Sequence, residues 1–263
     1  MTDQYTRQSF LGSKSAELLQ NATIAIVGLG GGGSHVAQQL AHVGIGRVLL
    51  FDPDRLELSN LNRLIGGTAA DVGARAEKVE IARRMFVAIN PAAEVHTYAV
   101  QWQLAADALR EADVVISCLD SYAARQDLEV SVRRFLTPLI DIGMDVHLVN
   151  EQPHMTGQVI LSVPGGPCFR CLGFLTDENL RQEAELYGAA GGRPQVVWSN
   201  GVLASVAVGL VVELLTGWQR RRFRAEYLHF DANEHVITHS PRLEYAPKQC
   251  THFAADFVGE PVL

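Results

Sequence analysis

A glycine cluster near the N-terminus has the residue types and the spacing that hold a phosphate. A glycine cluster follows the short apolar run 24–27, and within it we single out Gly28, Gly30, Gly31 and Gly33. Glycines let the backbone turn tightly and approach a phosphate, and the helical pattern over residues 34–43 offers N–H groups and a partial positive charge at its start. Asp52 ends the next apolar run, about 20 residues beyond the loop, where a carboxylate can bind both ribose hydroxyls. The segment therefore predicts a nucleotide-binding unit of strand, loop, helix and strand.

Three polar residues just beyond Asp52 indicate the class of nucleotide chemistry. Asp54, Asn60 and Arg63 stand in the stretch D-P-D-R-L-E-L-S-N-L-N-R. An NAD-dependent oxidoreductase shares the glycine pattern and the acid, but it needs no Asn and Arg at these positions. A triphosphate site does need them, because charge that builds on the phosphates must be met by fixed donors. A triphosphate site is therefore our hypothesis, and the oxidoreductase is the alternative.

Cysteines in the second half of the chain have metal-chelating spacing. Cys168 and Cys171 follow a Pro-Gly-Gly-Pro turn, which makes them a suitable half-site for zinc. Near the C-terminus, Cys250 and His252 could supply the other half, giving three cysteines and one histidine. A metal-free remnant of such a site is the alternative. The fourth cysteine, Cys118, is interpreted as a buried core residue rather than a nucleophile.

Helices that alternate with apolar strands position these residues. Strands are predicted at 24–27, 48–51, 94–100, 114–117 and 138–142, and helices at 15–20, 34–43, 72–90, 105–110 and 123–135. The alternation predicts a largely parallel sheet with helices on both faces. Asp120 then lies just beyond the carboxyl end of a strand, where open α/β sheets bind ligands.

The character of the chain changes after Gly143. We expect an antiparallel strand at 155–163, a turn-rich knuckle at 164–172, a mobile crossover loop at 176–194 with one helical turn, a buried helix at 199–215 and a closing hairpin at 227–239. The predicted fold is α/β, a Rossmann-like doubly wound and mostly parallel sheet with a smaller antiparallel C-terminal part. Residues 1–143 would form an N-terminal arm and the nucleotide-binding half. Residues 144–263 would form the antiparallel strands, the zinc knuckle and a partner-binding part of the same continuous domain.

Composition excludes several other classes of protein. A net charge of −7 over 263 residues argues against nucleic acid as a partner. The apolar stretch 201–217 is short and contains Glu213, so we expect a core helix and no membrane association. The N-terminal residues MTDQYTRQSF show no export signal, and four cysteines then indicate the reducing cytoplasm.

Six segments together resemble a single family. They are Tyr5-Thr6-Arg7-Gln8, the glycine loop 28–33, Asp52 with Asn60 and Arg63, Lys78, the stretch 117–121 and the knuckle 167–172. On these residues the chain is identified as a member of the ThiF/MoeB/HesA family, the adenylyltransferases similar to ubiquitin-activating enzymes. Its pattern is closest to molybdopterin-synthase adenylyltransferase. The resemblance covers nearly the whole chain. The chain departs from the family pattern at Leu64, where the family has a glutamine, and at Cys250-Thr251-His252, where the family has a second C-x-x-C.

The resemblance implies a role for each matched residue. Arg63 and Lys78 would contact the β- and γ-phosphates of ATP, with Arg75 as the alternative to Lys78, because the loop before Lys78 is longer than usual. Asp120 would hold Mg²⁺, and the alternative is that Asp120 caps the N-terminus of the helix that follows it. Arg7 would enter the ATP site of a neighbouring subunit, which implies a homodimer; a surface arginine is the alternative.

The implied activity is ATP-dependent adenylation of a C-terminal carboxylate. The substrate would be a ubiquitin-like or sulfur-carrier protein, activated as an acyl-adenylate with release of pyrophosphate. Residues 172–249 contain no cysteine, so we expect no thioester step. Adenylation of a small-molecule or tRNA-linked carboxylate and a catalytically silent nucleotide-binding protein are the alternatives.

Overall fold

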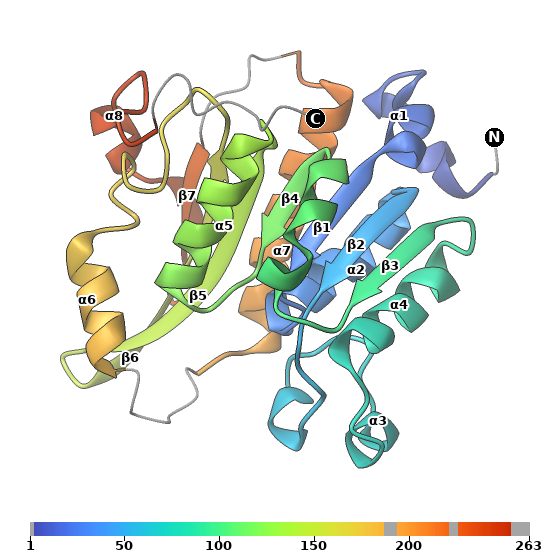
Figure 1. Cartoon of the computed structure of the whole chain (residues 1–263), viewed down its shortest axis with the longest axis horizontal. Helices are drawn as coiled ribbons and strands as arrows, with labels where there is room; N and C mark the ends of the chain where they lie inside the picture. Colours follow the sequence, from blue (N-terminus) through green and yellow to red (C-terminus); the bar gives the residue numbers. More distant parts are fainter. Residues whose placement is uncertain (1–2, 187–193, 221–225, 254–263) are drawn as a thin grey trace.

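One mixed sheet forms the centre of the molecule. The structure is a computed structural model, and it describes residues 3–186, 194–220 and 226–253. The strand order is β3-β2-β1-β4-β5-β6-β7-β8 (Figure 1). The strands are β1 Thr23–Val27, β2 Arg47–Phe51, β3 Glu94–Tyr98, β4 Val114–Ser117, β5 Leu139–Val149, β6 Gln152–Ser162, β7 Glu226–Asp231 and β8 Val236–His239. The neighbouring strands in the run β3-β2-β1-β4-β5 pair in parallel, and those in the run β5-β6-β7-β8 pair antiparallel. This arrangement confirms the predicted fold class.

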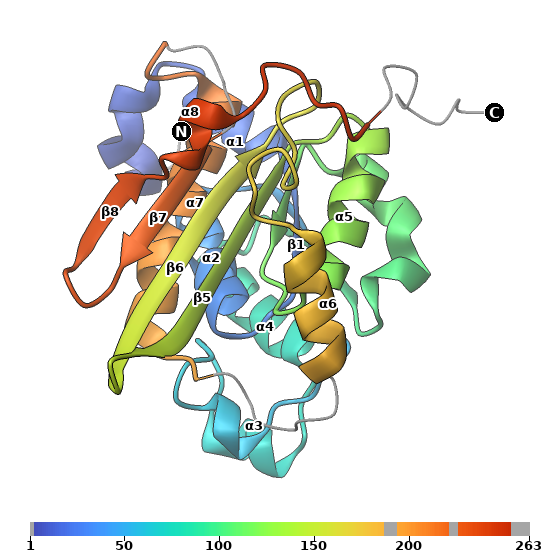
Figure 2. The ribbon, with the colours of Figure 1, turned by 90° about the vertical axis from the view of Figure 1, so that its left-hand side faces the viewer.

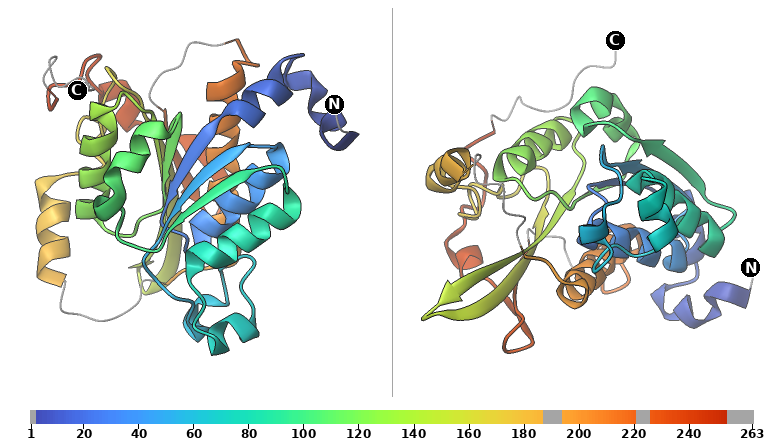
Figure 3. Two further views of the ribbon diagram at one scale, coloured as in Figure 1. Left: turned by 45° about the vertical axis from the view of Figure 1, so that its right-hand side comes forward. Right: turned by 90° about the horizontal axis from the view of Figure 1, so that it is seen from below.

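Helices cover both faces of the parallel part (Figure 3). The α-helices are α1 Ser15–Asn21, α2 Gly31–Val43, α3 Ala69–Gly73, α4 Lys78–Ile89, α5 Tyr122–Arg134, α6 Asp177–Leu186, α7 Val197–Thr216 and α8 Arg242–Tyr245, and the 3₁₀ segments are η1 Asp3–Leu11, η2 Leu58–Asn60 and η3 Trp102–Glu111. Strand β1 is buried on both sides. Ile24 and Ile26 pack into the core that holds α2, α4 and α7, while Ala25 and Val27 pack into the core that holds α5 and η3. The continuous apolar runs in the sequence follow from this double burial.

Helix α7 is long and apolar enough to cross a membrane by length and composition alone. Its most apolar window is 56% buried inside the molecule. Leu203, Ala207 and Val211 join α2 and the sheet in one core cluster. These contacts fit a core helix of a folded domain, as the sequence predicted.

Two helical predictions differ from the structure. The helix expected over 72–90 is two helices, because a capping box between Thr68 and Asp71 starts α3 and Arg75 then adopts a left-handed φ of 49° before α4 begins at Lys78. The loop expected at 176–194 contains the ten-residue helix α6 rather than one turn. Thr176 accepts a hydrogen bond from the Asn179 N–H at 3.1 Å and so caps that helix. Residues 187–193 lie outside the described part.

Strands β5 and β6 form a longer hairpin than the sequence suggested (Figure 2). They pair without interruption from Leu139↔Ser162 to Val149↔Gln152. Asn150 and Glu151 close the hairpin with φ of 49° and 65°, the conformation of a two-residue turn that matches strand twist. Residue 143, the proposed boundary between the two halves, lies inside β5.

Candidate active site and metal centre

A pocket of about 710 Å³ opens at the carboxyl ends of the parallel strands. Its size is that of a small-ligand site, and its place is where open α/β sheets bind ligands. Nine residues singled out from the sequence line it: Gly28, Gly30, Gly31, Asp52, Asp54, Asn60, Arg63, Lys78 and Asp120. They come from the ends of β1, β2 and β4 and from the loops that follow. The topology therefore gathers residues spread over about ninety positions of sequence into one cavity.

The glycine loop allows α2 to approach both the pocket and β1. Gly28 has a φ of 92°, and a Cβ there would lie 2.8 Å from the Cys118 carbonyl oxygen. A Cβ on Gly33 would collide with the Gly28 carbonyl oxygen. Gly33 therefore serves the close packing of α2 on the loop and, unlike the other three, does not line the pocket. Gly30 precedes the first turn of α2, so this helix starts at the pocket.

Asp52 binds the glycine loop from the neighbouring strand. Its Oδ2 accepts the Leu29 N–H at 2.6 Å, and its Oδ1 accepts the Asp54 N–H at 2.9 Å. Burial raises the pKa of this carboxyl above its ordinary value, and the nearby Lys78 and the two N–H donors act in the opposite direction. The carboxylate thus fixes the loop and remains at the wall of the pocket.

Lys78 is the lysine that the fold brings into the pocket. It is the first residue of α4 and is buried, and its Nζ lies 2.6 Å from Asp54 Oδ2 and 3.8 Å from Asp52 Oδ1. Arg75, the alternative considered from the sequence, is exposed and does not line the pocket. The split between α3 and α4 explains the longer loop, because it places Lys78 rather than Arg75 beside the two aspartates.

The segment after β2 presents Asn60 and Arg63 at the pocket mouth. The Asn60 side chain accepts the Glu57 N–H at 3.2 Å and so helps to fold η2. Arg63 Nη1 donates to the Ser59 carbonyl at 2.7 Å, which fixes the guanidinium over the turn. Leu64, in place of the family glutamine, is buried with Leu56 and Ile81 in a small apolar cluster. Leu64 therefore supports the turn after η2 by apolar packing, where a glutamine would make a polar contact.

Asp120 presents an exposed carboxylate at the pocket and is not the cap of α5. The cap is Ser121, whose Oγ accepts the Ala124 N–H at 3.2 Å. The interpretation of Asp120 as a helix cap is therefore wrong. Asp120 lies in the pocket lining, and capping of α5 does not account for an aspartate at this position.

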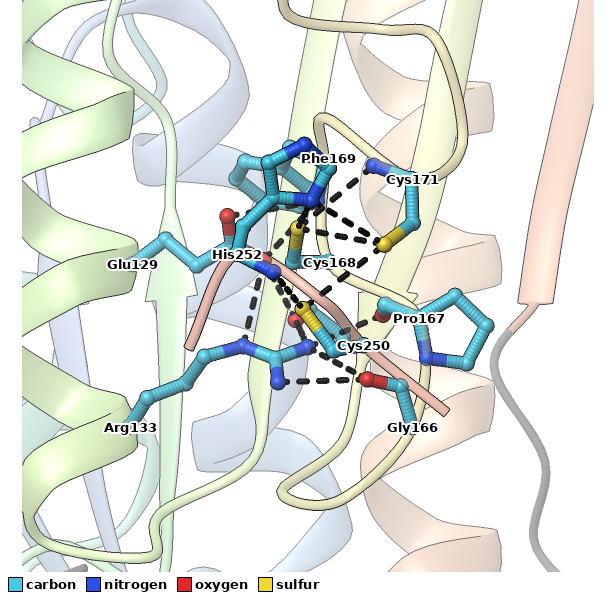
Figure 4. Close-up of polar contacts among 10 residues, drawn as sticks. Glu129, Arg133, Gly166, Pro167, Cys168, Phe169, Cys171, Cys250 and His252 are labelled. Carbon is cyan, nitrogen blue, oxygen red and sulfur yellow. Dashed lines mark hydrogen bonds and ion pairs between the residues drawn. The ribbon is translucent and has the colours of Figure 1, made fainter. Parts of the chain in front are cut away.

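Cys168, Cys171, Cys250 and His252 form the second site. Their ligand atoms all lie within 4.8 Å of one another. Cys168 Sγ lies 3.6 Å from Cys171 Sγ and 3.5 Å from His252 Nδ1, and Cys171 Sγ lies 3.6 Å from Cys250 Sγ and 3.3 Å from the same nitrogen (Figure 4). A tetrahedral zinc site with three sulfurs and one nitrogen has ligand–ligand edges of about 3.5–3.8 Å. The donor set and its spacing therefore fit zinc.

Residues 2–252 match the ThiF family. The chain belongs to the ThiF family. It is 32% identical over 221 residues to the molybdopterin-synthase adenylyltransferase of Escherichia coli, covering 82% of each protein. It is 33% identical over 175 residues to the sulfur carrier protein adenylyltransferase of Thermus thermophilus, covering 65% of this chain and 63% of that protein.

Other relatives of this ThiF-family chain are longer. It spans 51% of the rat ubiquitin-like modifier-activating enzyme 5, to which it is 30% identical over 214 residues and 76% of its own length. Among solved structures, E. coli MccB matches with a TM-score of 0.75 at 21% identity, covering 100% of this chain and 74% of that one. At that identity the likeness shows the fold. Family membership favours the triphosphate hypothesis over the oxidoreductase alternative.

Sequence reasoning missed several side chains of the pocket, among them Arg125, Asn200 and Glu183. Arg125 of α5 is buried and lines the cavity, and its Nε donates to Asp141 at 3.0 Å. A Cβ on Gly143 would collide with Arg125, which explains the glycine there. Asn200 of α7 and Glu183 of α6 line the cavity from the second half of the chain. The signal for Arg125 was its spacing, since it shares a helix face with the apolar Leu128 and Val132.

Glu183 connects α6 to the start of α5 beside Asp120. Its carboxylate accepts hydrogen bonds from Ser121 Oγ at 3.0 Å, from the Tyr122 N–H at 2.9 Å and from the Ala123 N–H at 3.0 Å. A carboxylate is stabilised at a helix N-terminus by the free N–H groups and the helix dipole. Helix α6 is therefore held against the rim of the pocket by a charge-assisted contact.

Arg7 lies far from the pocket of its own chain. It is exposed on η1, and this segment packs at the far end of α2, where Gln8 Nε2 donates to the His42 carbonyl at 3.4 Å. Helix α2 has 13 residues, so its two ends are about 20 Å apart. Arg7 therefore cannot reach the glycine loop at the other end of α2 within the same chain.

Proposed function

We propose that this protein is an ATP-dependent adenylyltransferase. A substrate carboxylate attacks the α-phosphate of ATP, pyrophosphate leaves, and an acyl-adenylate forms. The observation that carries the proposal is one pocket in which the glycine loop, Asp52, the cationic side chains of Arg63 and Lys78, and the carboxylate of Asp120 meet. Relatives named as adenylyltransferases across most of the chain support it.

The chemistry assigns a role to each pocket residue. Gly28, Gly30, Gly31 and the start of α2 would receive phosphate oxygens, and Asp52 would bind the ribose hydroxyls. Arg63 and Lys78 would contact the β- and γ-phosphates, where charge develops as pyrophosphate departs. Asp54 holds Lys78 in place, and Asn60 would add an amide contact.

Asp120 is the residue we assign to Mg²⁺. Magnesium prefers hard oxygen ligands, keeps several waters and is usually held by one or two carboxylates together with substrate phosphates. Asp120 suits that role, since its carboxylate is at the pocket and is not required as a cap. The ion would neutralise charge on the phosphates when ATP is bound.

The proposed substrate is the C-terminal carboxylate of a ubiquitin-like or sulfur-carrier protein. Relatives at 29–33% identity are named for sulfur-carrier and ubiquitin-like partners. The β5–β6 hairpin offers the apolar side chains of Leu148 and Val149, which are 71% and 42% exposed, as part of a docking surface. A small-molecule carboxylate is the second candidate, and the net charge of −7 argues against one carried by tRNA.

We infer that adenylation is the end point of the reaction. Cys118 is half-buried and lines the pocket instead of lying wholly in the core as predicted, and burial raises the pKa of its thiol, which keeps it protonated and poorly nucleophilic. The remaining three cysteines form the metal cluster, and we assign zinc to it. The assembly would be a homodimer in which Arg7 enters the partner's pocket, because the arm lies too far from its own. The free thiols suit the cytoplasm.

ATP–pyrophosphate exchange tests this proposal. The chain should catalyse exchange with Mg²⁺ in the presence of a suitable carrier protein, and a carrier lacking its terminal carboxylate should give none. Calorimetric titration should show binding of Mg-ATP and none of NAD. Tight NAD binding without any response to ATP would overturn the assignment.

A further inference from the structure

Helix α5 carries three buried charged residues on one face. Arg125, Glu129 and Arg133 are spaced by four, and they are 5%, 2% and 6% exposed. Buried charges are costly unless they are paired and hydrogen-bonded, so each is expected to have a specific partner. Arg125 pairs with Asp141 at the nucleotide pocket. Glu129 and Arg133 lie further along the helix, and their partners belong to the loops that carry the metal cluster (Figure 4).

Arg133 contacts both halves of the metal site. Its guanidinium donates to the Pro167 carbonyl at 2.9 Å and to the Gly166 carbonyl at 3.2 Å, directly before Cys168. The same guanidinium lies over the ring of Phe253, with Cζ 4.9 Å from the ring centroid, directly after His252. These halves are far apart in sequence: Cys171 and Cys250 are separated by 79 positions. One side chain thus ties them together without any metal.

Glu129 holds the other side of Cys168. Its carboxylate accepts the Phe169 N–H at 3.0 Å and the Ser162 hydroxyl at 2.6 Å, and it lies 3.5 Å from Arg133 Nε. The carbonyl before Cys168 and the amide after it are therefore both fixed by α5. The thiol of Cys168 is directed toward the other three ligands as a result.

We propose that Glu129 and Arg133 are outer-shell residues that preorganise the Cys168, Cys171, Cys250 and His252 site for zinc. This inference rests on the zinc assignment made above. Three thiolates and a neutral histidine around Zn²⁺ carry a net charge of −1, and Arg133 supplies a buried cation beside the loops that hold it. Outer-shell partners orient ligands before the metal arrives, so that less ordering is required on binding.

The test is zinc affinity in the full chain, measured by competition with a chromophoric chelator. Arg133→Met keeps most of the side-chain volume and removes the charge and the donors. It should weaken zinc binding about 10- to 100-fold, the usual cost of losing an outer-shell partner. Arg133→Lys should recover part of the loss. Arg134→Met is the matched control, since Arg134 is the neighbouring exposed arginine on the same helix, and it should bind zinc as the parent does.

Two further measurements keep the proposal falsifiable if Arg133→Met folds poorly. Phe253→Leu leaves the buried network intact and removes only the ring contact to the C-terminal half, so it should still weaken zinc binding several-fold. Cobalt-substituted Phe253→Leu should show an altered thiolate-to-cobalt absorption spectrum, because Arg133 no longer holds the segment that carries His252. Parent-like zinc affinity and spectra in both variants would overturn the proposed role of Glu129 and Arg133 and leave the zinc assignment standing. A parent chain that binds no zinc would overturn both.

Discussion

The nucleotide pocket and the metal cluster are built in different ways. In the pocket, Asp52 and Asp120 follow the buried parallel strands β2 and β4, so these two side chains are positioned by the sheet itself. The cluster is assembled from the loop at 168–171 and the segment at 250–252, which the sheet does not bring together. Buried charges on α5 make contacts to both. One site is therefore fixed by topology, and the other depends on specific side-chain contacts.

This difference predicts how each site should respond to substitution. Removing a pocket residue at a strand end should change the chemistry and leave the fold almost unaltered. Removing a cluster residue should lower stability and change the chemistry little. A chain in which both substitutions had the same effect would contradict the comparison.

The largest effect is expected at Asp120. Asp120→Ala should abolish ATP–pyrophosphate exchange, because the magnesium that offsets phosphate charge loses its ligand. Thermal stability should stay close to that of the parent. Ser121→Ala is the matched control: it removes the observed cap, costs about 1 kcal/mol of stability and retains exchange. Parent-rate exchange by Asp120→Ala would remove this residue from the catalytic set.

Arg7 should give the next largest effect, since in the role we propose for it the guanidinium meets the charge of the transition state. Arginine fingers in phosphoryl transfer contribute on the order of a thousandfold or more, so Arg7→Ala should slow adenylate formation by at least about a hundredfold. Dimer formation, followed by size-exclusion chromatography with light scattering, should be unchanged.

Mixing Arg7→Ala chains with Asp120→Ala chains tests whether the arginine acts in the partner. Half of the dimers in an equal mixture are mixed, and each has one intact site, so about a quarter of the parent activity should return. No recovery, with subunit exchange verified, would place Arg7 outside the partner's pocket.

Lys78 and Arg75 offer a direct contrast within the pocket. Lys78→Met should weaken Mg-ATP binding or slow exchange by about ten- to a hundredfold, because a buried cation beside the phosphates is lost. Arg75→Met should have little effect, since Arg75 is exposed and outside the pocket lining. Equal losses in the two variants would contradict the placement of Lys78.

Cys168→Ser should show the opposite pattern to Asp120→Ala. Loss of one ligand should release zinc, as measured by elemental analysis, and lower the free energy of unfolding by roughly 2 kcal/mol or more. Mg-ATP affinity should remain within a few-fold of the parent, because the pocket floor is held by the sheet. Retention of one zinc per chain would exclude Cys168 as a ligand.

The sequence predicted that Asp52 and Asp120 lie at one edge of the sheet, because each follows a strand that is recognisable by its continuous apolar run. Sequence reasoning missed Arg125, Asn200 and Glu183, since these reach the pocket only through packing of α5, α7 and α6. The helix expected over 72–90 is present from Lys78 to Ile89, but the left-handed turn at Arg75 that separates α3 from α4 was not predicted. The four candidate metal ligands were predicted from their residue types and spacing. The buried network of Glu129 and Arg133 was not predicted, because it depends on tertiary contacts.

The smallest expected effect concerns the protonation of Asp52. Burial raises its pKa in the folded chain, so it takes up a proton at a higher pH than an exposed aspartate does. As the pH falls from neutral toward this raised pKa, the parent should lose ATP affinity, because the neutral carboxyl binds the ribose hydroxyls and Lys78 less well.

Stability should respond to the same proton with the opposite sign. The folded state binds that proton more tightly than the unfolded state, so the contribution of Asp52 to stability is greatest below its unfolded pKa and falls as pH rises through its folded pKa. Asp52→Asn cannot titrate and should lack both trends. The comparison is made by calorimetric titration with Mg-ATP and by thermal unfolding of the two chains across this pH range. Parallel pH profiles for the parent and Asp52→Asn would show that another group controls the pocket. Divergent profiles would assign the proton to the carboxylate that joins the glycine loop to the end of β2.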